Sequence, residues 1–128
     1  ALSPDGTLVA AALSEGDGGD SYTAVFEVPG GRRVLKDALI ALDLAWGPNK
    51  ELYAVGLGEG GVRLVRFDLK AANPRPTPVA AVAGLVGAGA NMSDYDVAVS
   101  ADGKRVAVHD ALAGKRGRVV VYDPDGKE

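Results

Sequence analysis

The sequence predicts an all-β protein made of short antiparallel strands in repeating units. Two observations predict this fold class: one turn phrase recurs along the chain, and apolar stretches of strand length follow each copy. The turn opens at Ser3, Gly47 and Ser100, where the sequence reads SPDG, GPNK and SADG. The stretches are rich in Val, Leu and aromatic residues and are bounded by Gly, Pro, Asn or Asp, which is typical of strands.

The features around each turn keep the same order. A first apolar stretch follows the turn, and after a Gly-rich loop a second stretch ends in an aromatic–acid pair, at Phe26-Glu27, Phe67-Asp68 and Tyr122-Asp123. Asp43 and Asp96 stand at the same place before the second and third turns. A period of roughly 40–50 residues with about four strands per unit is typical of β-propeller blades. We therefore expect a β-propeller fragment of roughly ten strands in about three blades.

The units differ in completeness. Residues 1–38 form a partial blade, residues 39–92 a complete blade and residues 93–128 a second partial blade. The segment 32–46 has some helical spacing, but it runs into a stretch that the third unit repeats as strand, so strands are expected there. We expect strands at 7–13, 22–28 and 33–38, then at 41–46, 51–57, 62–69 and 79–86 after a Pro-interrupted loop, and finally at 94–100, 104–110 and 118–123.

The repeats resemble the TolB-type (PD40) β-propeller repeats, which are WD40-like. The phrases SPDG, GPNK and SADG carry the resemblance, and RFDL and VYDP stand where related repeats have Trp-Asp. The stretch DLAWGPNKELYAVG is also similar to NHL and lactonase-type propellers. The resemblance implies that complete relatives are extracytoplasmic binding or sensor domains of bacteria, so we expect a periplasmic or secreted location.

Composition narrows the classes of partner. The net charge is −3 and the basic residues are scattered, which argues against a nucleic-acid partner. No apolar run approaches the roughly 18 residues of a membrane span, so membrane insertion is not expected. The chain has no Cys, which excludes disulfides and thiolate metal sites.

Two sets of acidic residues are candidate metal ligands. Asp43 and Asp96 recur with the repeat and are expected near the propeller axis, where carboxylates could bind a cation. Their recurrence favours the other interpretation, in which each accepts backbone N–H groups of the next blade. The loop SEGDGGDS gathers Glu15, Asp17 and Asp20, and calcium is the cation that such a loop would suit. No other cofactor is expected.

No catalytic constellation is visible in the chain. His109 is the one histidine, and Asp110 beside it points to the opposite face of a strand. None of the serines stands in a G-x-S-x-G turn. The sequence therefore indicates no catalytic residues.

These observations favour a non-catalytic propeller scaffold that binds a protein or peptide partner. Three blades cannot close a ring, since natural propellers have about four to eight. We expect either missing blades in a larger parent chain or a homo-oligomer that completes the ring. The alternative is the propeller portion of an enzyme, either lactonase-like or sugar-dehydrogenase-like with an axial metal, or the gating domain of a peptidase.

Overall fold

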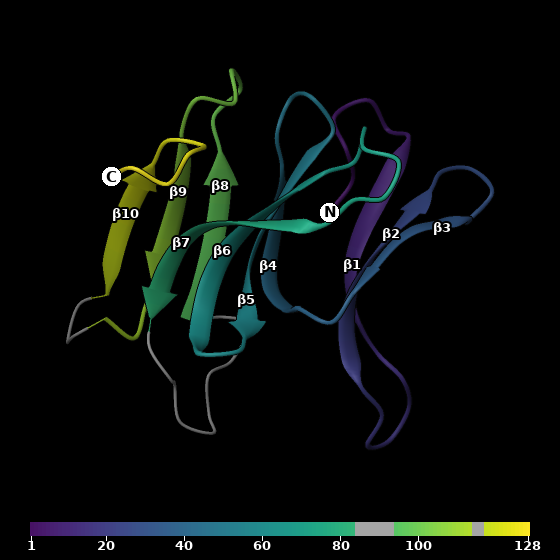
Figure 1. Ribbon diagram of the computed structural model, residues 1–128, viewed down its shortest axis with the longest axis horizontal. Helices are drawn as coiled ribbons and strands as arrows, with labels where there is room; N and C mark the ends of the chain where they lie inside the picture. Colours follow the sequence, from purple (N-terminus) through teal and green to yellow (C-terminus); the bar gives the residue numbers. More distant parts are fainter. Residues whose placement is uncertain (84–93, 114–116) are drawn as a thin grey trace.

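The computed structural model describes residues 1–83, 94–113 and 117–128, and these residues form ten strands in three antiparallel sheets (Figure 1). The first and third sheets have three strands each and the middle sheet has four. The expected all-β fold of about ten antiparallel strands is confirmed. The first sheet contains β1 (Leu8–Ser14), β2 (Ser21–Glu27) and β3 (Arg33–Asp37); the middle sheet contains β4 (Ile40–Trp46), β5 (Glu51–Gly58), β6 (Gly61–Asp68) and β7 (Pro76–Ala83); the third contains β8 (Tyr95–Val99), β9 (Val106–Asp110) and β10 (Arg118–Tyr122).

Strand β7 departs most from expectation. It begins at Pro76, three residues before the expected start, and the expected end at 84–86 lies outside the described residues. The prediction of a loop up to residue 78 is therefore wrong. Two prolines fit in this strand because β7 is the outermost strand of its sheet and pairs only with β6. The predicted blade boundary at residues 92–93 also lies outside the described residues, and the blade boundaries remain a prediction.

The recurring turn keeps one backbone feature in all three units, although the middle turn closes one residue sooner: the N–H of Gly47 donates to the carbonyl of Glu51, four residues on, whereas those of Ser3 and Ser100 donate five residues on. Its fourth residue has a positive φ each time: 71° at Gly6, 58° at Lys50 and 71° at Gly103. Glycine adopts this left-handed conformation without strain, whereas a residue with a Cβ does not. The middle turn thus places a strained residue where the other two have glycine.

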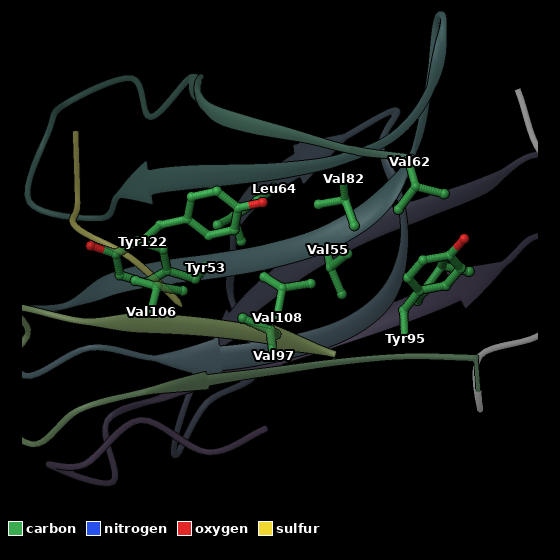
Figure 2. Packing of buried hydrophobic residues seen from close by; sticks show 11 residues of the cluster. Tyr53, Val55, Val62, Leu64, Val82, Tyr95, Val97, Val106, Val108 and Tyr122 are labelled. Carbon is green, nitrogen blue, oxygen red and sulfur yellow. The ribbon is translucent and has the colours of Figure 1, made fainter. Parts of the chain in front are cut away.

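The three sheets lie face to face and bury two apolar seams. Alternate residues of a strand point to opposite faces, so β5 sends Leu52 and Ala54 to the first sheet and Tyr53 and Val55 to the third. All four of these side chains are fully buried. Figure 2 shows the seam between the middle and third sheets, where side chains from β5, β6 and β7 meet those from β8, β9 and β10. The middle sheet therefore has no solvent-facing side in its centre.

Replacing Lys50 with Gly should raise the free energy of unfolding by up to about 1 kcal/mol, because it removes the left-handed strain. Glycine also increases the conformational entropy of the unfolded chain, which offsets part of this increase in the free energy of unfolding. The exposed ion pair that Lys50 makes with Asp5, at 3.6 Å, contributes little. Gly6→Ala is the matched control: a Cβ at Gly6 meets no atom within 4 Å, so strain alone should destabilise this variant by about 1 kcal/mol. Urea unfolding measures both changes, and a loss of stability in Lys50→Gly contradicts the explanation.

Candidate functional site

Asp43 connects the middle sheet to the third. Its Oδ2 accepts a hydrogen bond of 2.8 Å from the backbone N–H of Val97, on the inner strand of the third sheet. Val97 pairs with Val108 at a position where an antiparallel strand directs its N–H away from its partner strand. The Asp43 carboxylate therefore accepts a hydrogen bond from a backbone N–H that cannot pair with the neighbouring strand β9. This contact confirms the structural interpretation of Asp43.

Asp96 occupies the corresponding position of the third sheet and has different surroundings. Its side chain is 68% exposed, and its Oδ2 lies 3.1 Å from Nδ1 of His109 on β9. Both side chains lie on the face that points away from the middle sheet, whereas Asp110 is buried on the opposite side. The divergence of His109 and Asp110 expected from the strand geometry is thus observed.

The acidic loop between β1 and β2 does not bring its carboxylates together. Glu15 pairs with Lys36 of β3 at 2.8 Å, and the Lys36 ammonium holds the pKa of this carboxyl below its usual value. Asp17 and Asp20 are exposed. Among residues 1–83, 94–113 and 117–128, no group of three or more His, Asp or Glu side chains could hold a metal ion. Asp43, Asp96 and the loop acids therefore lie at separate places, and calcium binding stays a prediction.

The two Ser-x-Asp-Gly turns each contain an aspartate whose pKa is lowered by hydrogen bonds within the turn. Asp5 Oδ1 accepts hydrogen bonds from the Thr7 hydroxyl at 2.7 Å, the Thr7 N–H at 3.0 Å and the Ser3 hydroxyl at 2.8 Å. These donors, those of Thr7 first, lower the pKa of Asp5 far below its usual value. Asp102 repeats the arrangement with the Lys104 N–H and the Ser100 hydroxyl, and its pKa is lowered as well. Each of these carboxylates therefore stabilises its own turn through hydrogen bonds to residues of that turn.

A groove opens at one end of the seam between the first and middle sheets, beside the turns that join β2 to β3, β4 to β5 and β6 to β7. Its volume is 370 Å³, and apolar parts of Leu8, Val34 and Leu69 line it. The remaining lining combines charged groups with small side chains: Glu27, Arg32, Arg33, Lys50, Ala71, Ala72 and Pro74.

The charge of this groove is uneven. Arg32 is already paired with Glu27, through a contact of 3.0 Å from Nε and a second, shorter contact from Nη2. Arg33 is exposed and has no ion-pair partner within 4.0 Å among the described residues, although its charge acts on Glu15 and helps to lower the pKa of that carboxyl. In the sequence, Arg32 and Arg33 count only among the scattered basic residues that argue against a nucleic-acid partner. The groove could not be predicted, because a groove between two sheets leaves no local signal in the chain.

A second groove opens between β3 and β7, beyond the other end of the same seam. It measures 290 Å³ and is more apolar, with Leu39, Val65, Pro76 and Pro78 in its wall and Arg63 at its edge.

The sequence model of the lipoprotein LpqB β-propeller domain matches residues 1–127. The chain belongs to this family. None of the curated proteins is similar enough to the chain to count as a match.

Membership in the LpqB β-propeller domain family confirms that the three sheets are part of a propeller. It confirms the predicted resemblance at the level of the β-propeller. The TolB-type and NHL-like character remain predictions, since the family description names neither. Among the described residues, no helix is long and apolar enough to cross a membrane.

Acid should weaken the turns of this propeller domain. Because the pKa of Asp5 is lower in the folded chain than the roughly 3.9 of an unfolded aspartate, its charge stabilises the fold above about pH 4. That contribution is lost as the pH falls below about 4 towards the folded-state pKa. Thermal unfolding between pH 5 and pH 3 should therefore show a steeper loss of stability in the wild type than in Asp5→Asn, with the smallest slope in the Asp5→Asn/Asp102→Asn double variant. Equal slopes in all three proteins contradict the role assigned to these carboxylates.

Proposed function

We propose that the chain is a non-catalytic propeller scaffold that holds an extended segment of a partner protein on the outside of a bacterial cell membrane. The location follows from the lipoprotein family, because lipoproteins are proteins of the cell envelope. The binding role is supported by the groove that exposed Arg33 lines together with apolar residues.

The chemistry of this groove favours a particular kind of segment. Leu8, Val34 and Leu69 offer apolar contacts to one or two side chains of a bound segment. Arg33 offers a planar guanidinium that can form paired hydrogen bonds with a carboxylate. We therefore expect a segment in which an acidic residue stands next to apolar residues.

The rigid first sheet on one side of the groove suits such a role. The groove lies over the buried seam that contains Leu52, Val65 and Phe67. Side chains in a close-packed seam have little freedom, so the wall formed by Leu8 and Val34 of the first sheet is held in place before a segment binds, whereas the opposite wall belongs to the loop after β6. Sites on such preformed walls lose less entropy on binding than sites on free loops.

Selection of displayed random peptides on the complete protein tests this proposal. The selected peptides should be enriched in Asp or Glu beside apolar residues, and synthetic copies should bind at least about tenfold more weakly to Arg33→Glu, a loss of about 1.4 kcal/mol. Arg105→Glu is the matched control: Arg105 is exposed at the turn between β8 and β9, and the charge change is the same. A less than twofold change is expected there. Peptides without acidic residues, or equal losses in the two variants, would contradict the proposal.

A further inference from the structure

Residues 1–128 contain four Asp-Gly dipeptides, and the fold gives them different surroundings. An aspartate carboxyl group can react with the backbone nitrogen of the next residue, and glycine hinders this reaction least because it has no Cβ. The reaction needs a carboxyl group and a glycine N–H that are both free to move towards each other. The four dipeptides are Asp5-Gly6, Asp17-Gly18, Asp102-Gly103 and Asp125-Gly126.

The first turn holds both reacting groups of Asp5-Gly6. Asp5 Oδ1 accepts hydrogen bonds from Thr7 and Ser3. The Gly6 N–H donates to the Ser3 carbonyl at 2.9 Å. The donors to Asp5, those of Thr7 first, keep the pKa of this carboxyl far below its usual value. Because the reaction expels one carboxyl oxygen as water, which an ionised carboxylate does not release readily, the low pKa adds to the protection.

The turn of the third sheet holds Asp102-Gly103 in the same way. Asp102 Oδ1 accepts hydrogen bonds from the Lys104 N–H at 3.0 Å and the Ser100 hydroxyl at 2.7 Å. The Gly103 N–H donates to the Ser100 carbonyl at 2.9 Å. Neither reacting group is free in this turn.

The Asp125-Gly126 dipeptide keeps half of this protection. The Gly126 N–H donates to the Asp123 carbonyl at 2.9 Å. A Cβ at Gly126 would lie 1.9 Å from the carbonyl oxygen of Val79, so the backbone of this turn packs directly on β7. The Asp125 side chain is exposed, and the restraint therefore acts on the nitrogen alone.

The Asp17-Gly18 dipeptide stands in the loop between β1 and β2 and has none of these contacts. Asp17 and Gly18 are exposed, and a Cβ at Gly18 meets no atom within 4 Å. Among the described residues, neither the Asp17 carboxylate nor the Gly18 N–H has a hydrogen-bond partner. The bond from the Gly19 N–H to the Gly16 carbonyl, at 3.5 Å, encloses the dipeptide without using its groups.

We propose that Asp17 is a site of spontaneous isomerisation to isoaspartate in the folded protein, and that the hydrogen bonds of the other three turns protect their Asp-Gly dipeptides. The lone pair of the Gly18 nitrogen forms a bond to Cγ of Asp17 while the N–H proton leaves. The C–OH bond breaks and releases water, which closes a five-membered imide ring.

Water then opens this ring. Attack at the former main-chain carbonyl carbon of Asp17 leaves the backbone running through Cγ, with the former main-chain carboxyl group as the side chain. One water is released and one is taken up, so the mass of the protein does not change. The product has one more methylene group in the backbone of the exposed loop, outside both apolar seams, so the packing of the sheets does not oppose the reaction.

Peptide mapping of the complete protein after storage at pH 6 and 37 °C tests this proposal. An endoproteinase that cuts before aspartate does not cut before isoaspartate, so each conversion leaves its own uncut peptide, which for Asp17 spans residues 5–19. The Asp17 peptide should accumulate at least about fivefold faster than the Asp5 and Asp102 peptides, because at those sites hydrogen bonds must break before the groups can meet. It should also accumulate faster than the Asp125 peptide.

Storage in guanidinium chloride is the matched control. The four dipeptides have the same chemistry once the turns are unfolded, so they should convert at similar rates there. Any of the other three that converts as fast as Asp17 in the folded protein overturns the proposal. A ranking that stays the same in guanidinium chloride also overturns it, because the difference would then come from the local sequence and not from the fold.

The variant Ser100→Ala tests whether the turn hydrogen bonds supply the protection. It removes the hydroxyl that donates to Asp102 and accepts from the Arg105 N–H at 2.9 Å. The rate at Asp102 should rise several-fold, while the rate at Asp5, whose own turn is intact, should not change. No increase at Asp102, or an equal increase at Asp5, overturns the assignment of the protection to the hydrogen bonds of each turn.

This inference goes beyond the proposed binding function. The peptide selection examines the groove that Arg33 lines, whereas peptide mapping follows a reaction in the loop between β1 and β2. Failure of one test leaves the other intact.

Discussion

The burial of both faces of the middle sheet is the constraint on which the rest of the structure depends. A single antiparallel sheet can leave one face in water, but the middle sheet here has fully buried residues on both sides, with Leu52 and Phe67 on one and Tyr53 and Leu64 on the other. Leu52, Leu64 and Phe67 each contribute about 1.5–3 kcal/mol when their side chains leave water. Neither neighbouring sheet can be removed without exposing one of these faces, so the fold is a stack of mutually dependent layers.

The polar groups of the inner strands follow from that stacking. An inner strand has a partner on one side only, so half of its N–H groups need another acceptor. Asp43 supplies one to the neighbouring sheet, while Arg118 donates to the carbonyl of Val82 across the same seam at 3.1 Å. The groove at Arg33 lies at one end of the other seam, between strand residues of the first sheet and turn residues of the middle sheet.

Much of this fold could be predicted from the sequence because the signals for its turns and strands are local and recur in each unit. The turns at Ser3, Gly47 and Ser100 set where strands start, and alternating or continuous apolar stretches set their lengths. The start of β7 could not be found this way, because Pro76 and Pro78 suggest a loop unless the strand is known to lie at an edge. The role of Asp43 was predictable from its recurrence, whereas the groove at Arg33 is lined by residues distant in sequence, such as Leu8 and Leu69, which only the packing of two sheets brings to one place.

Amide hydrogen exchange of Val97 tests most directly whether the sheets are joined as described. The strand alternation directs the N–H groups of both Val97 and Val99 away from β9, and of the two only Val97 has an acceptor among the described residues. The account predicts that the Val97 amide exchanges only through global unfolding, as slowly as the amides of the central strand β5, while the Val99 amide exchanges much faster. Equally fast exchange of the two amides would contradict it, because the seam that holds Asp43 against the third sheet would then open without unfolding.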